Sequence, residues 1–394
     1  MKTFGRRLSD VLLKEIHLPG VVVLTGMRQV GKTTLLKYIF DSVQSPSKVF
    51  LDLENPINQK VFEEDNFDNI LVNLENFGFV PGKKSYVCLD EIQLAPRVVS
   101  AVKYLYDKYK IKFFLTGSSS FYLKNLFPES LAGRKVTYEL FPLDFQEFLV
   151  IKGKERKPAA SFSAAVKQKS RISCQLYKKF YEEYLDFGGF PAVVLASGQE
   201  RKRRILEDIF KSYFEKDVRV MADFKDLGKL RDFIVLLAAR AGSKIEISNI
   251  ASDLGLSRET IYSYLGFLEK TYFVFLLSPY ARNTGSEVRG AKKVYFCDNG
   301  LLNYASRVSG GSLFENAVFH DLRKYGKLNY YEKYKGGEID FILDKKIAFE
   351  VKTSAGAADL KRLSRQGGEL GLRNHFLITR EYCDLPRTIP AQDL

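Results

Sequence analysis

Short runs of apolar and β-branched residues alternate with helix-like stretches over about the first 150 residues. The runs are VVVLTG at 21, KVFLDL at 48, SYVCLDE at 85, IKFFLTGS at 111 and RKVTYEL at 134. Strands that alternate with helices are typical of a parallel sheet covered by helices on both faces. We therefore expect an α/β domain with a doubly wound parallel sheet over residues 1–150.

The pattern changes after residue 150. Residues 152–171 are basic and poor in large apolar side chains, which predicts a mobile insertion or linker. From about 175 to 240, Phe, Tyr and Leu recur at three- and four-residue spacing, interrupted by the turn DFGGFP at 186–191. The segment 151–240 is therefore interpreted as this linker followed by a helical lid.

A helix-turn-helix pattern follows in residues 241–300. The run ISNIASDLGLSRETIYSYLGFLEKTYFVFLL at 247–277 predicts a helix, a turn at Gly255, a second helix capped by Ser257, and a closing strand. The second helix would present Arg258, Tyr262 and Lys270 to a DNA groove, and the basic loop 281–293 would form a wing. The alternative is that this winged-helix module only packs neighbouring domains together. Residues 301–394 return to a mixed α/β pattern.

A phosphate-binding loop follows the first predicted strand. Residues 26–33, GMRQVGKT, match G-x-x-x-x-G-K-[ST] between an apolar strand and a helical run, the context that this motif requires. Glycines let the backbone amides surround phosphate, Lys32 would reach the β and γ phosphates, and the Thr33 hydroxyl would bind Mg²⁺. The expected ATP-binding residues in this loop are Gly26, Arg28, Gln29, Val30, Gly31, Lys32, Thr33 and Thr34.

Two carboxylates end the strand at 86–89. Asp90 and Glu91 would lie at the carboxyl edge of the parallel sheet, where ligands of such folds bind. We expect Asp90 to hold the magnesium ion through its water and Glu91 to polarise the attacking water. Water as the nucleophile favours ATP hydrolysis over a small-molecule kinase reaction.

Two further catalytic residues are predicted. Ser118 follows the strand at 113–116, and its hydroxyl would contact the γ-phosphate or the attacking water; the alternative is a capping serine. Arg134, in LAGR at 131–134, would neutralise charge on its own or a neighbouring subunit's nucleotide, and the alternative is a surface arginine.

A second group of charged residues lies near the C-terminus. The segment 338–352 predicts a hairpin whose turn centres on Lys345, so that Asp340 faces Glu350 with β-carbons about 5 Å apart. Facing carboxylates repel unless a cation lies between them or one is protonated. We expect Asp340 and Glu350 to bind Mg²⁺, with Lys352 stabilising a phosphate transition state or orienting water. The alternatives are a hairpin with a solvated charged face and a degenerate nuclease fold that binds without cutting.

Length, composition and charge indicate a folded protein with several domains. The 394 residues are long enough for two to four domains, and 45% hydrophobic residues are enough for folded cores. Widely spaced cysteines favour a reducing cytoplasm, and the charged N-terminus and short apolar runs predict neither a signal peptide nor a membrane span. A net charge of +14 favours a polyanionic partner, although a basic solubilising surface explains it as well.

The combined motifs resemble a family of archaeal and bacterial AAA-type ATPases in which the P-loop domain precedes a domain of unknown function, DUF4143. The resemblance lies in GMRQVGKTT, CLDEIQ (88–93), LTGSSS (115–120), LAGRK (131–135), FPLDFQEF (141–148), FGGFP (187–191) and FCDNGLLN (296–303). It implies ATP binding, a regulatory or defence-type role, and an α/β C-terminal domain over 301–394. The hairpin resembles the PD-(D/E)xK nuclease fold, in which Glu315 would match the acidic residue of the preceding helix.

Two functions fit these features. In the first, ATP hydrolysis is coupled to DNA binding or processing by the C-terminal half, with ATP, Mg²⁺ and DNA as ligands. In the second, the chain is a nucleotide-dependent switch that acts on a protein partner or changes its oligomeric state, and the nuclease-like domain is inactive.

Overall fold

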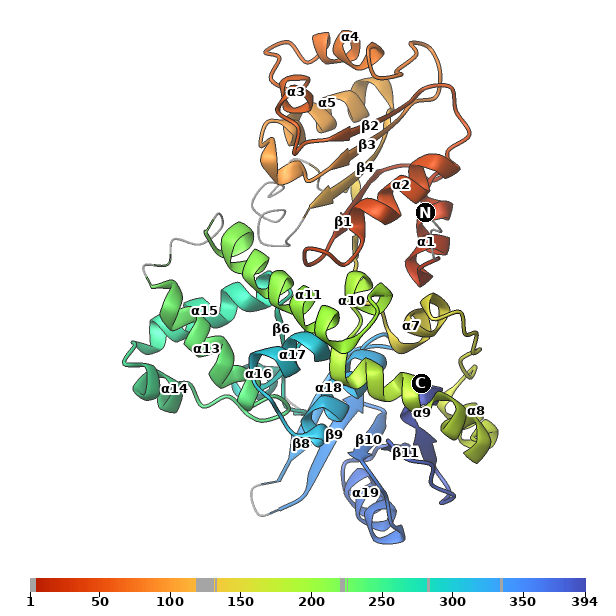
Figure 1. Ribbon diagram of the computed structural model, residues 1–394, viewed down its shortest axis with the longest axis vertical. Coiled ribbons are helices and arrows are strands. Elements are labelled where there is room, and N and C mark those ends of the chain that lie inside the picture. Colours follow the sequence, from red (N-terminus) through yellow and green to blue (C-terminus); the bar gives the residue numbers. More distant parts are fainter. Residues whose placement is uncertain are drawn as a thin grey trace. The chain divides into compact units, whose positions relative to one another are not determined.

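The computed structural model describes residues 5–117, 131, 133–219, 224, 226–281, 284–333 and 336–394 (Figure 1). These residues form two compact units. Unit 1 comprises residues 1–141, 215–223 and 270–272, and unit 2 comprises residues 142–214, 224–269 and 273–394. Unit 2 contains most of the three segments expected after residue 150, and their separation at 240 and 300 stays a prediction. No helix within the described ranges has the length and apolar character needed to cross a membrane.

Unit 1 is an α/β domain. Its elements are α1 (Arg7–Glu15), β1 (Val21–Thr25), α2 (Lys32–Ser42), β2 (Lys48–Asp52), α3 (Pro56–Lys60), α4 (Asn69–Glu75), β3 (Tyr86–Asp90), the 3₁₀ turn η1 (Ile92–Leu94), α5 (Val98–Tyr109), β4 (Lys112–Gly117) and β5 (Lys135–Glu139). All five predicted strands are present.

The strands of unit 1 form a parallel sheet in the order β2-β3-β4-β1-β5. Val23 pairs with Leu115 and Leu89 pairs with Leu115 on its other side, so β4 lies between the strand of the phosphate loop and the strand of Asp90. Because the strands are parallel, their carboxyl ends meet at one edge. This order brings the ends of β1, β4 and β3 next to one another.

Both faces of the sheet are buried. Alternate side chains, among them Val21, Val23, Val87 and Leu89, form one core with Val98 and other residues of α4 and α5. On the other face α2 contacts β2, β3 and β4. Two buried faces explain why β1 and β3 have continuous apolar sequences rather than alternating ones. The predicted doubly wound P-loop α/β fold is confirmed.

Unit 2 begins with helices and ends with a mixed sheet. Its elements are α7 (Phe145–Ile151), α8 (Phe162–Gln168), α9 (Arg171–Phe187), α10 (Pro191–Leu195), α11 (Gln199–Ser212), α13 (Leu227–Ala239), α14 (Ile247–Leu254), α15 (Arg258–Lys270), β6 (Val274–Leu277), α16 (Thr284–Arg289), β7 (Lys293–Phe296), α17 (Asn299–Ala305), α18 (Gly310–Leu322), β8 (Leu328–Glu332), β9 (Glu338–Leu343), β10 (Ile347–Lys352), α19 (Ala357–Glu369), β11 (Asn374–Thr379), β12 (Thr388–Pro390) and the 3₁₀ turn η3 (Ala391–Asp393). A π-helix, η2 (Tyr213–Val218), continues α11 and crosses from unit 2 into unit 1 along the chain.

The C-terminal sheet has the order β12-β11-β10-β9-β8. Phe349 and Phe376 on one face pack in a core with Phe314 and Phe319 of α18, whereas Ile342 and other residues of the opposite face pack with Leu363 of α19. The hairpin β9–β10 has the predicted register: Leu343 pairs with Ile347 and Phe341 pairs with Phe349.

Residues 152–171, expected to be a mobile insertion or linker, include a packed helix, and their assignment as an insertion stays a prediction. They contain α8, whose Phe162 ring packs edge-on against Phe349 at 4.9 Å. The ammonium of Lys169 donates to the carbonyl oxygens of Cys383 and Leu385 at 3.0 and 2.6 Å. Ala165 lies in the core of unit 2, and Phe162 and Val166 pack against it beside residues far away in sequence such as Phe349 and Phe376.

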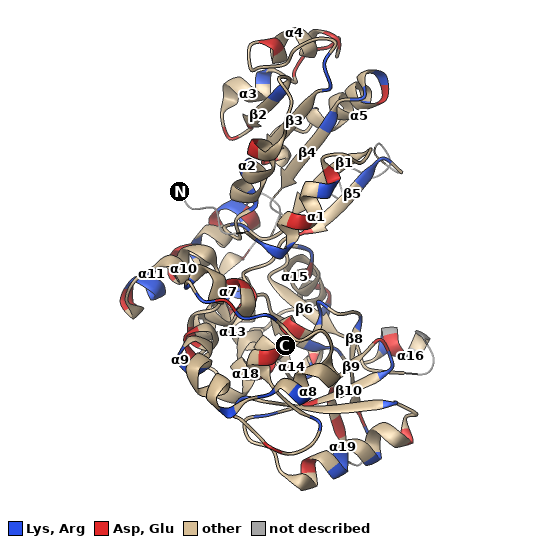
Figure 2. Ribbon diagram, turned by 90° about the vertical axis from the view of Figure 1, so that its right-hand side faces the viewer, with Lys and Arg blue, Asp and Glu red and all other residues tan. Residues whose placement is uncertain are grey.

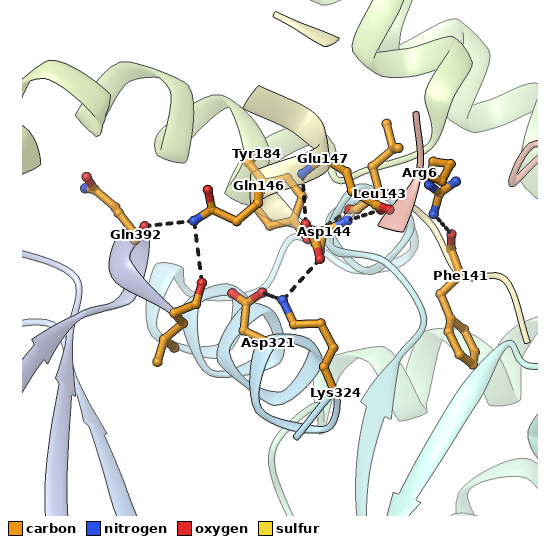
Figure 3. A network of polar contacts seen from close by, with 11 residues as sticks. Arg6, Phe141, Leu143, Asp144, Gln146, Glu147, Tyr184, Asp321, Lys324 and Gln392 are labelled. Atoms are coloured by element: carbon orange, nitrogen blue, oxygen red, sulfur yellow. Dashed lines mark hydrogen bonds and ion pairs between the residues drawn. The ribbon is translucent and has the colours of Figure 1, made fainter. Parts of the chain in front are cut away.

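The FPLDFQEF motif at 141–148 joins the start of unit 2 to its end (Figure 3). Asp144 caps α7 by accepting from the Glu147 amide at 2.9 Å, and it also accepts at 3.2 Å from Lys324, which follows the end of α18. Gln146 donates to the carbonyl oxygen of Gln392 at 3.2 Å. The motif therefore has a structural role within unit 2.

The expected helix-turn-helix elements are present as α14, Gly255 with φ 62°, and α15, where Ser257 accepts from the Thr260 amide at 3.1 Å. The expected wing is not a free loop. It contains α16, and Glu287 accepts from Lys327 and Lys345 at 2.6 and 2.8 Å, beside the C-terminal sheet. The winged-helix assignment stays a prediction.

Candidate nucleotide site

The phosphate loop connects β1 directly to α2. Gly26 has φ 151° and Gly31 has φ 99°, and Gln29 between them has φ 63°. A Cβ at Gly26 would lie 2.1 Å from the carbonyl oxygen of Leu140, so any side chain there would collide with backbone. The glycines are therefore required by the course of the loop, which leads the backbone amides to the N-terminus of α2.

Lys32 begins α2 and points back into the loop. Its side chain is buried, and its ammonium donates to the carbonyl oxygens of Gly26 at 3.0 Å and Met27 at 2.9 Å. Burial lowers the pKa of Lys32, while the carboxylates of Glu91, Asp217 and Asp90 oppose that shift. Phosphate oxygens are stronger hydrogen-bond acceptors than carbonyls, so a bound triphosphate would replace the two carbonyls as the partner of the Lys32 ammonium.

Asp90, Thr116 and Thr33 meet at the carboxyl edge of the sheet. The Thr116 hydroxyl donates to Asp90 Oδ1, and the Thr33 hydroxyl is also hydrogen-bonded to this carboxylate. Burial raises the pKa of Asp90, and the two hydroxyl bonds counteract it. Thr116 was not among the predicted residues; its position at the end of the strand between β1 and β3 could have identified it.

Glu91 follows Asp90 with φ 54°, a left-handed conformation that is strained for a residue with a side chain. Its amide donates to the Thr116 hydroxyl at 3.1 Å, and its carboxylate accepts from the Gln93 side chain. Thr116 therefore connects both acidic residues. Strain at such a position is common where a side chain is held for chemistry.

The donor set fits Mg²⁺ bound together with a nucleotide. Among the described residues, no three His, Cys, Asp or Glu side chains are grouped so that they could hold a metal ion by themselves. Mg²⁺ commonly takes one or two protein oxygens, several waters and the substrate phosphates. Thr33 and Asp90, already in contact with each other, match that requirement.

Two residues outside the predicted set support the loop. Arg6 donates to the carbonyl oxygens of Val30 at 3.0 Å and Phe141 at 2.7 Å (Figure 3). Arg28 forms an ion pair with Asp217, a residue of the π-helix η2, at 3.0 Å. Neither contact is local in sequence, which is why the motif did not reveal it.

The two remaining predicted catalytic residues differ in outcome. Ser118 lies outside the described residues. Arg134 lies at the amino edge of the sheet, where its carbonyl accepts from the Val21 amide at 2.8 Å and its guanidinium contacts Asp107 at 2.7 Å. The length of β1, about 15 Å, separates this edge from the phosphate loop. Action of Arg134 on its own nucleotide was therefore a wrong expectation; action on a neighbouring subunit's nucleotide stays a prediction.

The C-terminal acidic residues also come together, and we call Glu315, Glu338, Asp340 and Glu350 the carboxylate cluster. Burial and the neighbouring Glu315 raise the pKa of Asp340 to about 7. Asp340 Oδ2 accepts from the Val351 amide at 2.7 Å, and Glu350 contacts Lys352 at 3.0 Å. Glu315 thus lies near Asp340 and Glu338, and Lys293 and Lys352 lie among these carboxylates. Binding of a metal here stays a prediction.

Three segments of the chain match models of protein families. Residues 19–149 match the model of an AAA domain, residues 178–312 match a domain of unknown function (DUF8612), and residues 310–390 match a domain of unknown function (DUF4143). Together with the sheet order and the phosphate loop, these matches support an AAA-type P-loop domain over residues 19–149 that is followed by a DUF4143 domain. The nucleotide site described above lies within the AAA-matched segment, except for Arg6 and Asp217.

Curated relatives span most of the chain. An uncharacterized protein of Methanocaldococcus jannaschii is 29% identical over 336 residues, which are 82% of this chain and 72% of the relative. An uncharacterized protein of Haemophilus influenzae is 29% identical over 361 residues, 86% of this chain and 85% of the relative.

Solved structures align more distantly. The RuvB Holliday junction branch migration motor of Thermotoga maritima aligns at 15% identity with a TM-score of 0.31, covering 69% of this chain and 89% of that chain. The ADP form of the Aeropyrum pernix ORC2 protein aligns at 15% identity with a TM-score of 0.33, covering 68% and 85%. The fold assignment rests on the strand order given above.

Proposed function

We propose that the chain binds ATP and Mg²⁺ in the loop 26–34 and hydrolyses ATP, and that its nucleotide state is coupled to DNA binding by unit 2. The observation that carries the ATPase proposal is the meeting of Lys32, Thr33, Asp90, Thr116 and Glu91 at one sheet edge. This grouping of an ammonium, two hydroxyls and two carboxylates supports the proposal.

Lys32 would leave the loop carbonyls and bind the β and γ phosphates, while the loop amides hold the same groups. Thr33 and Asp90 would hold Mg²⁺, which neutralises charge that develops on the phosphates. Glu91, oriented by Gln93 and by its own amide bond to Thr116, would accept a proton from the attacking water.

Substitution of Lys32 and Glu91 tests this assignment. Lys32→Ala should lose binding of a fluorescent ATP analogue, whereas Lys37→Ala, an exposed lysine of the same helix, should keep it. Glu91→Gln should bind ATP but turn it over about 100-fold more slowly, the usual effect of losing a general base. Normal turnover by Glu91→Gln would disprove its role.

DNA coupling is supported by net charge and by the exposed face of α15. The chain carries a net charge of +14, and Figure 2 shows basic residues along elements of both units. Arg258, Tyr262 and Lys270 are exposed on α15, with Tyr262 60% exposed. Turnover should rise on addition of duplex or single-stranded DNA, and the effect should weaken with salt. Unchanged turnover with both forms of DNA at low salt would reject this coupling.

A nucleotide-dependent switch that acts on a protein partner is the second candidate. The ion pairs of Glu287 favour it, because they hold the expected DNA-binding wing against the C-terminal sheet. An ATP-dependent change in oligomeric state, measured by light scattering, without DNA affinity would support the switch.

A further inference from the structure

Asp217 reaches the phosphate loop from a distant part of the chain. It is 2% exposed and lies in the π-helix η2, a rare conformation that is frequent at functional sites. Its Oδ1 accepts from Arg28 Nε at 3.0 Å. Its Oδ2 is buried and has no hydrogen-bond partner among the described residues. When one oxygen of a buried carboxylate has no partner, the stability of its charged form depends strongly on the hydrogen bond to the other oxygen.

The same carboxylate faces the charges of the nucleotide site. Lys32 and Glu91 both interact electrostatically with Asp217, and Arg28 is its ion-pair partner. Exposed Glu215 and Lys216 share its helical segment. A triphosphate bound to Lys32 would bring further negative charge next to Asp217, and like charges at such distances repel. Arg28, a residue of the loop itself, would then lie between two anions.

We propose that Asp217 is a positioning residue for ATP. It forms an ion pair with Arg28 when no nucleotide is bound, and Arg28 leaves this ion pair to bind the phosphates when ATP binds. This inference rests on the proposed function. Loss of Arg28 leaves Asp217 buried and unpaired, so ATP binding acts on η2. The chain passes from unit 2 to unit 1 at residue 215, within this helix. Nucleotide binding thereby removes an ion pair from the segment through which the chain passes from one unit to the other.

Equilibrium binding of a fluorescent ATP analogue between pH 5 and pH 8 tests the exchange. Burial raises the pKa of Asp217 to about 6, so its repulsion is present above that pH and disappears below it. Asp217→Asn should therefore bind the analogue about tenfold more tightly than the wild type at pH 8, a change equal to about 1.4 kcal/mol, and equally at pH 5. Titration of the analogue itself cancels in this ratio of affinities.

The controls separate the inference from its premise. Glu215→Gln, which removes an exposed charge from the same π-helix, should leave the ratio near one at every pH. If Asp217→Asn binds like the wild type across the pH range, or binds more weakly, the exchange is rejected. If Lys32→Ala binds as tightly as the wild type, the proposed nucleotide site itself fails.

A second, independent inference concerns the carboxylate cluster in unit 2. Lys293 of β7 lies inside the cluster with its side chain 4% exposed. Its ammonium donates to Glu338 and lies 3.9 Å from Glu315 Oε1, which accepts from the Tyr295 hydroxyl at 2.7 Å. Asp340 also acts electrostatically on Lys293. Lysine thus supplies the cation that three neighbouring carboxylates require.

The cluster does not fit a divalent metal in this arrangement. The described residues include no group of three acidic, His or Cys side chains placed to hold a metal ion. Glu350 is engaged by Lys352 and Arg362, and Asp340 by the Val351 amide. We propose that Lys293 is the resident cation of the cluster and excludes divalent metals, so that this domain does not cut nucleic acid by metal-dependent chemistry.

Terbium luminescence tests this exclusion, because a Tb³⁺ ion held by Glu315 would be excited through the Tyr295 ring. The wild type should show no saturable signal that Mn²⁺ displaces. Lys293→Met should gain one, and the double variant Lys293→Met/Tyr295→Phe should lose it. Lys292→Met, a neighbouring lysine, should behave like the wild type. A displaceable signal in the wild type that Asp340→Asn abolishes would overturn the proposal, and so would a folded Lys293→Met variant without signal.

Discussion

Thr116 illustrates how one buried hydroxyl organises the nucleotide site. It donates to Asp90 and accepts from the Glu91 amide, so it holds the expected magnesium-binding residue and the expected base together. The residue is completely buried, and no other side chain in the described region contacts both groups in this way. Its contribution should therefore appear in catalysis rather than in nucleotide affinity.

Thr116→Val keeps the shape of the side chain and removes the hydroxyl. We expect the kcat for ATP hydrolysis to fall about 10- to 100-fold, the size of effect caused by misplaced catalytic groups, with ATP affinity nearly unchanged. Steady-state turnover and analogue binding measure the two quantities. Thr116→Ser, which restores the hydroxyl, should recover most of the rate. Equal losses in both variants would show that packing, not the hydroxyl, matters.

At the scale of elements, two separate motifs form one structure around Asp298. The carboxylate caps α17 by accepting from the Leu301 amide at 3.1 Å and also accepts from the Gly189 amide at 2.6 Å. FGGFP and FCDNGLLN are therefore two halves of one contact. A Cβ at Gly188 would lie 2.1 Å from Asp298 Oδ1, which explains the glycine.

Substituting alanine for Gly188 and for Gly198 distinguishes the cost of a collision with Asp298 from the cost of backbone strain. Gly188 has φ 73° and Gly198 has φ 79°. A Cβ added at Gly188 would lie within 4 Å of other atoms, whereas a Cβ added at Gly198 would not. Both substitutions should cost about 1–3 kcal/mol for a positive-φ backbone with extended ψ, which side chains rarely adopt, and Gly188→Ala should cost about 1–3 kcal/mol more for the collision. Chemical denaturation of the two variants measures the difference. Equal free energies of unfolding would contradict the role given to Asp298.

At the scale of the whole molecule, buried carboxylates make stability depend on pH. Burial raises the pKa of Asp217 and Asp298 to about 6, from about 3.9 in an unfolded chain. The folded protein then binds more protons than the unfolded chain between about pH 4 and pH 6, so stability falls as pH rises through this window. Asp340, whose pKa burial raises to about 7, acts in the same sense up to about pH 7. His320, whose pKa burial lowers to about 3, acts in the opposite sense between about pH 3 and pH 6.5, so the three carboxylates must outweigh it.

The Tm of the wild type should therefore be a few degrees higher at pH 5 than at pH 7.5. Asp298→Asn, which removes one of the titrating groups, should reduce this difference. Differential scanning fluorimetry in buffers of matched ionic strength measures both. A wild-type Tm that rises steadily from pH 5 to pH 7.5 would show that other groups dominate.

The phosphate loop and the parallel sheet were predictable because their causes are local. Strand formation depends on continuous β-branched runs, and GMRQVGKT defines its own backbone path through glycines at positive φ. The β9–β10 register was predictable for the same reason, since the turn at Asp344 and Lys345 determines the pairing on both sides.

Sequence alone determined the P-loop α/β class and the register of the β9–β10 hairpin, and it proposed the residues of the nucleotide site. The tertiary structure decided which distant groups join them. It placed Asp217 on Arg28, Thr116 between Asp90 and Glu91, Lys293 inside the carboxylate cluster, and Arg134 at the opposite sheet edge. These contacts depend on strand order and on packing between segments far apart in the chain, which local spacing does not encode.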